Sequence, residues 1–310
     1  MSDRNILRIK QNYPLWMKIE ISKSRINNAI DKFGRNELYV SFSGGKDSTV
    51  LHYLVAEVEL ERFGDIKIPR VFDDTGLEFP ELRQFAKTIA NVIIRPNMNF
   101  KQVLEKYGYP VISKTQAMAI RKLRTQNLSD EYRNKLLYGD ERCTAGKLSN
   151  KYHYLLNAPF KISEQCCDVM KKRPFHAYEK NTNRIPMTGV MASESNNRET
   201  RYLNDGGCNA FNIKNPQSKP LGIWLETDIL EYLKTNNLPY ASVYGEIVAK
   251  DDKLTTTGEK RTGCVFCGFG ANRSSDDRFK RLKETHPNLY DYCMNKLNLK
   301  EVLDYLNIKH

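Results

Sequence analysis

A seven-residue string rich in glycine and hydroxyl side chains gives the sequence its first chemical signal. Its glycines let backbone amides approach an anion closely, its lysine adds a positive charge, and its hydroxyls can donate hydrogen bonds to phosphate oxygens. The spacing differs from the Walker A pattern, which places four residues between its first glycine and its Gly-Lys pair. We therefore predict a pyrophosphate-binding loop of another type; the alternative is an ordinary Gly-Gly turn with a helix cap. The string reads Ser43, Gly44, Gly45, Lys46, Asp47, Ser48 and Thr49.

Four of the seven cysteines form two pairs that suit the binding of a metal. Cys166 and Cys167 are adjacent, and Cys264 and Cys267 follow after 96 intervening residues. Four thiolates in two pairs can bind either a [4Fe–4S] cluster or a zinc ion. Adjacent cysteines are awkward ligands for zinc, because neighbouring side chains diverge in regular structure. The remaining alternative is a set of buried thiols without a metal.

The other three cysteines have no paired neighbour. An odd number of cysteines and an N-terminal stretch without an apolar signal-peptide core argue against a disulfide framework. We interpret Cys143 and Cys293 as structural. Cys208 follows two glycines in a predicted loop and is the one candidate for a reactive thiol.

Strand-like and helical segments alternate around the glycine-rich string. Short apolar runs predict strands at 38–42, 68–72, 92–94 and 186–191. Helices are predicted after the string, from Pro80, and at 224–235, and the N-terminal 5–33 segment is expected to be helical, with a break at Pro14 and a stop at Gly34. This alternation predicts an α/β fold with a parallel twisted sheet flanked by helices, whose ligand lies beyond the carboxyl ends of the strands.

The remaining segments complete the expected organisation. Residues 101–160 read as mainly helical, 250–262 as a charged loop, and 276–309 as an amphipathic helix. We expect three parts: an N-terminal helical extension over 1–36, a nucleotide-binding α/β domain over 37–250, and a C-terminal region with cysteines and helices over 251–310.

Composition places the chain among globular proteins with a basic surface. Its formal net charge is +12 over 310 residues, and 40% of the residues are hydrophobic. No apolar stretch is long enough for a membrane span, so we expect a cytoplasmic protein without membrane contact. The positive charge suits any anionic ligand, such as a nucleotide, and also leaves open a nucleic-acid partner such as tRNA or DNA.

Several strings together resemble the phosphoadenylyl-sulfate (PAPS) reductase family of the adenine-nucleotide α-hydrolase, or PP-loop, superfamily. The loop is similar to the pyrophosphate loop of that superfamily, the 71–81 segment resembles the family's DTG-x-x-F-x-E motif, and the 189–198 segment resembles its G-x-R-A-x-E-S-x-x-R motif. Trp224, Tyr232 and Pro239 also fall as in the family, and the resemblance covers about 36 to 270. It implies a PP-loop, Rossmann-like fold and a [4Fe–4S] cluster on the two cysteine pairs. It also extends the nucleotide-binding set beyond the loop to Asp74, Thr75, Gly189, Glu194, Ser195 and Arg198.

Two features depart from the reductase pattern. The sequence lacks the Glu-Cys-Gly-x-His tail that supplies the nucleophilic cysteine of thiol-dependent reductases, and Met191 stands where the family often has arginine. These departures suit a relative that uses ATP, releases pyrophosphate and transfers AMP to an acceptor before sulfur displaces the AMP. Relatives of this kind act in DNA phosphorothioation and tRNA thiolation.

In that reaction Lys46, Asp47 and Asp74 are the catalytic candidates. Loop amides and Lys46 would stabilise the leaving pyrophosphate, with Asp47 or Asp74 holding Mg²⁺; alternatively, Asp47 only caps a helix and Asp74 only stabilises a turn. The partners would be an adenine nucleotide, a nucleic acid as sulfur acceptor, and a sulfur-donor or redox protein. The other candidate functions are a sulfonucleotide reductase and a catalytically silent nucleotide- or nucleic-acid-binding module.

Overall fold

The computed structural model describes residues 3–140 and 146–310, which form two compact units. The unit boundaries do not coincide with the expected ones near residues 36 and 250. The N-terminal helices belong with the sheet, because Leu7, Ile26 and Ile30 are buried in the same core as the sheet residues. Unit 1 comprises Met1–Asp74, Glu78–Arg95 and Phe175–Thr262, and unit 2 comprises Thr75–Leu77, Pro96–Pro174 and Gly263–His310.

Unit 1 is built on a six-stranded sheet with the order β3-β2-β1-β5-β7-β6. The sheet is parallel as predicted, except that the edge strand β6 runs antiparallel to β7. The central strand β1 is paired on both sides, with Val40 opposite Arg70 of β2 and Met187 of β5. The bounds are β1 Leu38–Ser41, β2 Arg70–Asp73, β3 Val92–Ile94, β5 Ile185–Thr188, β6 Asn209–Ala210 and β7 Gln217–Ser218.

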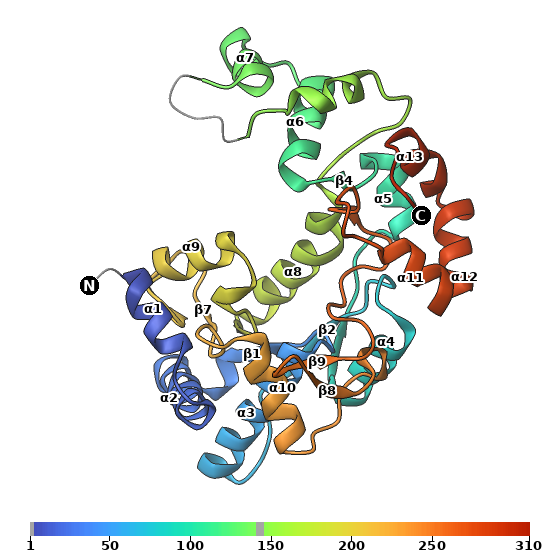
Figure 1. Cartoon of the computed structure of the whole chain (residues 1–310). Coiled ribbons are helices and arrows are strands. Elements are labelled where there is room, and N and C mark those ends of the chain that lie inside the picture. Colours follow the sequence, from blue (N-terminus) through green and yellow to red (C-terminus); the bar gives the residue numbers. More distant parts are fainter. Residues whose placement is uncertain (1–2, 141–145) are drawn as a thin grey trace. The chain divides into compact units, whose positions relative to one another are not determined.

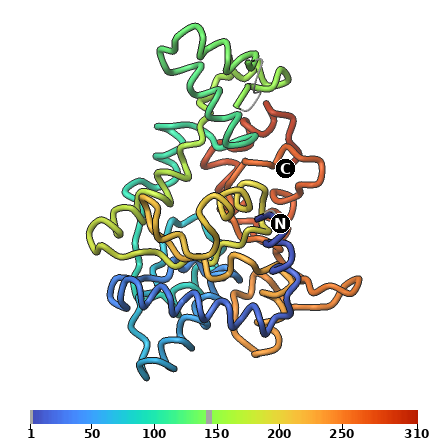
Figure 2. The backbone as a smooth tube through the Cα atoms, turned by 90° about the vertical axis from the view of Figure 1, so that its left-hand side faces the viewer, coloured from blue at the N-terminus to red at the C-terminus, as the bar shows by residue number. Residues whose placement is uncertain are grey.

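Seven α-helices of the described chain accompany this sheet, together with short 3-10 helices at Arg35–Glu37, Ala192–Glu194 and Ser242–Tyr244 (Figure 1). The predicted break and stop are confirmed: Pro14 precedes the second helix, and Gly34, at φ +86°, ends it with its N–H bonded to the Ile30 carbonyl. Figure 2 shows these first two helices in blue. The bounds are α1 Asp3–Gln11, α2 Leu15–Phe33, α3 Lys46–Phe63, α4 Pro80–Ile89, α8 Arg173–Thr182, α9 Asn196–Asn204 and α10 Glu226–Thr235.

The segment after α10 differs from the loop that the sequence suggests. Strands β8 (Ile247–Lys250) and β9 (Lys253–Thr256) pair as an antiparallel hairpin. Its two-residue turn places Asp251 and Asp252 at φ +50° and +60°. Aspartate tolerates this left-handed conformation, so the turn needs no glycine to mark it in the sequence.

Unit 2 is mainly helical, as predicted for 101–160, and also contains a short parallel strand pair that the sequence did not reveal. The expected single helix over 276–309 is wrong, because Pro287 starts a new helix and Asn298 adopts a left-handed conformation before the last one. The bounds are α5 Phe100–Tyr107, β4 Val111–Ile112, α6 Lys114–Thr125, α7 Asp130–Tyr138, β10 Gly268–Phe269, α11 Arg278–Thr285, α12 Pro287–Asp291 and α13 Leu299–Tyr305, with a 3-10 helix at Asn150–Asn157 and short π-helices at Asp168–Lys172 and Tyr292–Lys296.

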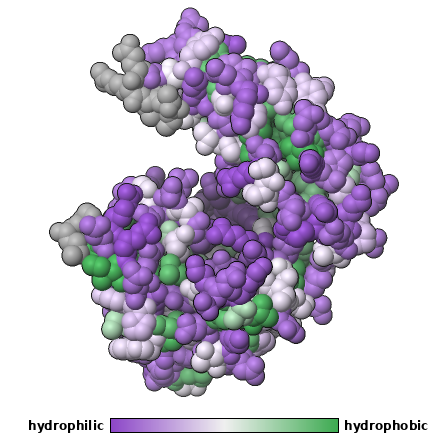
Figure 3. Space-filling model, viewed as in Figure 1, coloured by the Kyte–Doolittle hydropathy of each residue, from purple (hydrophilic) through white to green (hydrophobic). Residues whose placement is uncertain are grey.

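The surface in Figure 3 is largely hydrophilic, with small separated hydrophobic areas. Among the described residues, no helix is both long and apolar enough to span a membrane.

A buried ion pair joins α2 to the start of α10. The Lys18 ammonium is 1% exposed and lies 2.6 Å from the Asp228 carboxylate, which also accepts a hydrogen bond from the Leu225 amide. Removing one partner of a buried pair leaves an uncompensated charge. This pair therefore fixes the first turn of α10, which carries Glu226.

We predict that Lys18→Met lowers the free energy of unfolding by about 3–5 kcal/mol, because Asp228 would remain buried without its counter-charge. Urea denaturation measures the change. Lys23→Met is the matched control on the same helix; its ion pairs with Glu57 and Glu61 lie near the surface, so a loss of about 1 kcal/mol or less is expected. The double variant Lys18→Met/Asp228→Asn should recover part of the loss. An equal loss in the two single variants would contradict this account.

Candidate functional site

The glycine-rich string forms the turn between β1 and α3, as predicted. Gly44 has φ +74°, and a Cβ on it would lie 3.0 Å from both the Ala86 Cβ and the Leu82 carbonyl oxygen. Gly45 directly precedes the first residue of α3. The loop amides thus open an 18-residue helix, whose N-terminus favours a negative charge.

Lys46 is the most enclosed charge of the loop. It is 5% exposed, its ammonium lies 2.8 Å from the Glu226 carboxylate, and it donates a hydrogen bond of 3.0 Å to the Lys260 carbonyl. The ammonium also lies 5.0 Å from the ring centre of Tyr244, whose hydroxyl contacts the Thr262 hydroxyl at 2.6 Å. Glu226 is half-exposed, so the lysine is paired with a carboxylate at the edge of the site.

The loop hydroxyls are arranged around the same turn. Ser48 and Thr49 donate to the Gly45 carbonyl at 2.9 and 3.0 Å, and the Ser43 and Ser48 hydroxyls lie 3.1 Å apart. Ser43 is exposed, whereas Ser48 and Thr49 are buried. In this state Ser48 and Thr49 shape the loop, and Ser43 is the hydroxyl open to a ligand.

The 189–198 segment lies directly against the loop. A Cβ on Gly189 would lie 2.9 Å from the carbonyl carbon and oxygen of Asp47, so only glycine permits this approach. Glu194 forms an ion pair with Arg198 and accepts a hydrogen bond from the Met191 amide. Ser195 accepts a hydrogen bond from the Arg198 amide and caps α9.

Asp47 carries the strongest electrostatic perturbation of the loop. Burial, followed by the negative charges of Glu194 and Glu226, raises the pKa of Asp47 to about 6, and Lys46 opposes this rise. Three carboxyl groups therefore act on one another beside the loop. A bound cation, such as a divalent metal ion, would relieve the repulsion between these carboxyl groups.

Asp74 lies at the end of β2 and is already paired. Its carboxylate is completely buried and contacts Arg83 at 2.5 Å and Lys87 at 3.1 Å. Burial raises the pKa of Asp74, but these two cations outweigh it and hold the pKa below its ordinary value. Thr75 belongs to unit 2, where its hydroxyl accepts a hydrogen bond from the Leu77 amide.

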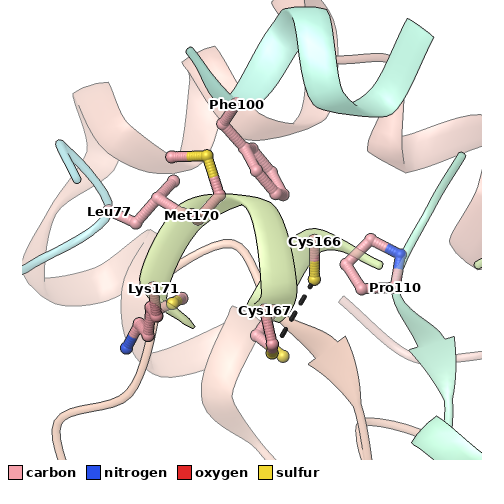
Figure 4. Close-up of a pocket in the computed structure, with 9 residues that line it drawn as sticks. Leu77, Phe100, Pro110, Cys166, Cys167, Met170 and Lys171 are labelled. Carbon is pink, nitrogen blue, oxygen red and sulfur yellow. Dashed lines mark hydrogen bonds between the residues drawn. The ribbon is translucent and has the colours of Figure 1, made fainter. Parts of the chain in front are cut away.

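The two cysteine pairs meet in unit 2. Cys166, Cys167, Cys264 and Cys267 line one small pocket, the cysteine pocket, together with Leu77, Phe100, Pro110, Met170 and Lys171 (Figure 4). Its volume is about 20 Å³, the room of about one water molecule. Of the described residues, no three His, Cys, Asp or Glu side chains are grouped closely enough to hold a single metal ion.

A contact between two thiols, supported by neighbouring cations, favours the thiolate form of Cys167 in the cysteine pocket. The Cys166 thiol donates to the Cys167 sulfur at 3.9 Å, which lowers the pKa of Cys167 to about 6; Lys114 and Lys171 add to this effect. The same contact raises the pKa of Cys166, and burial raises that of Cys267. The donor set suits a metal that binds thiolates.

The cysteines outside the pocket are enclosed where the structure describes them. Burial raises the pKa of Cys208 and raises that of Cys293 to about 12. Cys208 is 6% exposed, and nearby Asp205 is paired with Lys219, so burial and not that carboxylate sets its pKa. Cys143 lies outside the described residues.

A family model for the phosphoadenosine phosphosulfate reductase domain matches residues 37–137 and 124–267. The chain belongs to this family. A search among curated proteins finds no match to the sequence.

Three solved structures illustrate the range of proteins similar to this family member. The first is a PAPS reductase from Candida auris in a phosphate complex; the match covers 75% of this chain and 89% of that chain at 14% identity, with a TM-score of 0.40. The second is the Candida glabrata FMN adenylyltransferase in complex with ATP, with 80% and 68% of the two chains covered at 14% identity and a TM-score of 0.43. The third is the U34-tRNA thiolase NcsA from Methanococcus maripaludis with its [4Fe–4S] cluster, with 93% and 80% covered at 14% identity and a TM-score of 0.39. At these TM-scores they carry no argument about activity.

The departure at Met191 has a structural reason in this PAPS reductase family member. Met191 is 3% exposed and packs in the core with Trp224 and Tyr202, so the position offers no contact to an anion.

Residues outside the recognised motifs also shape the two sites. Glu226, Tyr244 and the Lys260 carbonyl enclose Lys46, while Lys114 acts on Cys167. The sequence predicted only the helix over 224–235 that contains Glu226. That prediction does not indicate which side chain Glu226 meets.

We predict that Asp47→Asn stabilises the nucleotide-free protein at pH 7 by at most about 3 kcal/mol. Because the folded-state pKa of Asp47 is raised from 3.8 to about 6, the unmodified protein loses stability as the pH rises between these values, and the amide avoids this loss. The gain should therefore be present at pH 7 and nearly absent at pH 4, as urea denaturation at both pH values would show. Asp31→Asn, at an exposed ion pair with Arg62, is the control and should change stability little. A gain of equal size at both pH values would contradict the assignment.

Proposed function

We propose that this PAPS reductase family member binds ATP at the 43–49 loop and activates an acceptor by AMP transfer. An acceptor oxygen attacks the α-phosphorus, the bond from that phosphorus to the bridging oxygen breaks, and pyrophosphate leaves. Hydrosulfide delivered by a donor protein then attacks the carbon or phosphorus atom that carries the activated oxygen, its proton is lost to solvent, and AMP leaves with the acceptor oxygen. The acceptor that suits the net charge of +12 is a nucleic acid such as tRNA or DNA.

The burial of Lys46 carries this proposal. A nearly enclosed ammonium beside a helix N-terminus costs free energy, and Glu226 offsets that cost while no ligand is bound. Phosphate oxygens would replace the Glu226 carboxylate with a stronger set of charges. Fixed cations and amides aimed at the leaving pyrophosphate stabilise charge without reorganisation during the reaction.

Asp47 is the loop carboxylate suited to Mg²⁺. Magnesium is usually held by one or two carboxylates together with substrate phosphates, so a preformed group of three protein ligands is not needed. The raised pKa of Asp47 and the nearby charges of Glu194 and Glu226 favour cation binding there. Asp74 is less suited, because Arg83 and Lys87 already occupy its carboxylate.

The six cysteines that the structure describes favour phosphate chemistry over thiol attack on a sulfonucleotide. A nucleophilic thiol needs access and a lowered pKa. Cys208 and Cys293 are both buried with raised pKa values. The four thiols of the cysteine pocket are the metal ligands of this proposal and would not be free to attack.

The cysteine pocket is suited to a [4Fe–4S] cluster held by Cys166, Cys167, Cys264 and Cys267. Zinc needs all four sulfurs within about 2.3 Å of one ion, whereas the thiolates of a four-iron cluster bind separate irons and lie farther apart. The similarity of the two cysteine pairs to the cluster-binding pattern of the family's iron–sulfur members favours the cluster over zinc. The thiols would have to turn away from one another to admit it. A bound cluster supplies a redox centre or a fixed charge.

We predict slow pyrophosphate release from ATP by the anaerobically purified protein, faster when acceptor is present, and no appreciable sulfite from APS or PAPS with thioredoxin.

Lys46→Ala should weaken ATP binding at least about tenfold, because a charge-assisted hydrogen bond contributes about 1.5–3 kcal/mol. Glu226→Gln should instead tighten ATP binding, because it removes the carboxylate that competes for Lys46. Calorimetric titration and product analysis measure these effects.

Lys234→Ala, at an exposed position of α10, is the matched control and should leave both measurements unchanged. Robust sulfite release, abolished by Cys208→Ser, would replace this proposal with the sulfonucleotide reductase. Nucleotide binding without any product would indicate a catalytically silent module.

We predict brown anaerobic protein with about four irons per chain. Cys167→Ser and Cys267→Ser should lose the visible absorbance and most of the iron, whereas Cys208→Ala, outside the pocket, should keep both. Iron analysis and absorption spectroscopy decide the matter, and colourless protein with stoichiometric zinc would refute the cluster.

A further inference from the structure

The positive charge of the chain is concentrated in unit 2. This unit contains 23 lysines and arginines against 13 aspartates and glutamates, a formal net charge of +10. Unit 1 contains the remaining 26 and 24, a net charge of +2, although it is the larger unit and carries the proposed ATP loop. The basic character of the chain therefore does not belong to the nucleotide loop.

A groove on unit 2 displays part of this charge. It encloses about 270 Å³ between α5 and the turn before α13, and the lysines at its rim are Lys101, Lys161 and Lys296. Lys101 and Lys296 are exposed, and neither forms an ion pair with an acidic residue of the described chain. Lys161 binds the carbonyls of Glu105 and Lys106 at the end of α5. Glu105 is the one acidic residue in the lining.

A row of aromatic rings continues from the floor of this groove to the surface. Tyr109 contacts Phe160 with ring centres 5.9 Å apart, Phe160 contacts Tyr305 at 5.3 Å, and Tyr305 lies 5.9 Å from Tyr154 at an angle of 30°. Tyr154 and Tyr305 are 44% and 38% exposed. These two exposed rings, tilted by 30° to each other, leave aromatic surface open to a further flat group.

We propose that this groove and the Tyr154–Tyr305 pair, together the tyrosine groove, bind a single-stranded segment of a nucleic acid. Sites for single strands combine a basic groove that follows the phosphates with aromatic rings on which bases stack. The rim lysines supply the first element and the exposed tyrosines the second. The identity of this strand as the sulfur acceptor rests on the proposed function; the binding itself does not.

Charge complementarity alone would also suit an acidic protein, but the aromatic row favours nucleic acid. An acidic peptide needs cations and offers few flat groups, whereas every base has a face that stacks on tyrosine. Unpaired strands present these faces and duplexes do not. We therefore expect a preference for single strands over a duplex of the same sequence.

The test is the binding of fluorescent single-stranded RNA, single-stranded DNA and the matching duplex to the full-length protein without ATP. The single strands should bind more tightly than the duplex, and a preference between RNA and DNA identifies the sugar of the natural partner. Lys101→Ala/Lys296→Ala should weaken binding and reduce the slope of log affinity against log salt by about 1.4, because each lost phosphate contact removes about 0.7. Tyr154→Ala should weaken binding roughly fivefold or more at constant salt slope.

Lys32→Ala/Lys234→Ala is the matched control, because it removes the same charge from exposed positions of unit 1. It should leave strand affinity and salt slope unchanged. Circular dichroism and thermal melting of each variant distinguish lost contacts from lost folding. The proposal is overturned if no strand binds, if the control weakens binding as much as the groove variants, or if polyglutamate competes as well as RNA.

The outcome is separable from that of the proposed reaction. Lys46→Ala should keep full strand affinity, since Lys46 belongs to unit 1 and the measurement contains no ATP. Loss of strand binding with intact pyrophosphate release would refute the tyrosine groove alone. Strand binding without pyrophosphate release would refute the AMP-transfer reaction alone.

Discussion

A lysine ammonium that is almost fully buried needs a negative partner, because the protein interior solvates an isolated charge poorly. In unit 1 this requirement falls on Lys46, and the surrounding elements meet it jointly. The start of α10 supplies Glu226, the chain before Cys264 supplies the Lys260 carbonyl, and Tyr244 supplies a ring face. The buried pair of Lys18 with Asp228 in turn holds the first turn of α10 in place. A cation so enclosed is preorganised for an anion that reaches the loop.

The carboxylates near the loop partly offset the positive charge of Lys46. A nucleotide bound together with a metal ion would change this balance between positive and negative charge. Burial and the negative charges of Glu194 and Glu226 raise the pKa of Asp47 to about 6. Gly189 allows Glu194 to lie near Asp47, because only a residue without a Cβ lets the 189–198 segment pack against the Asp47 peptide. The same segment places Met191 in the core. The position where the family often has an arginine therefore contributes to packing in this chain.

The sequence predicted the parts of the molecule whose signals are local. The strand, glycine turn and helix around residues 38–56, the break at Pro14 and the stop at Gly34 all follow from short-range backbone preferences, and the structure has them. The β8–β9 hairpin was missed because aspartates occupy its left-handed turn, and the long C-terminal helix was predicted because apolar spacing does not reveal the interruption at Asn298. Long-range partners such as Glu226 for Lys46, or Lys114 for Cys167, carry no local signal at all.

The distribution of charge between the units has a physical consequence that the total of +12 conceals. Screening limits an exposed charge to a range of about 8–10 Å at physiological ionic strength, so a ligand responds to the nearby charges and not to the sum. In the proposed reaction, ATP at the nearly neutral unit 1 would be held by a few enclosed groups, among them Lys46, which is 5% exposed. A long polyanion gains from many exposed lysines at once, and unit 2 offers these beside tyrosine faces. The two anions of the proposed reaction would thus meet two different kinds of positive charge: a buried one at the loop, and exposed lysines on unit 2 whose effect depends on salt.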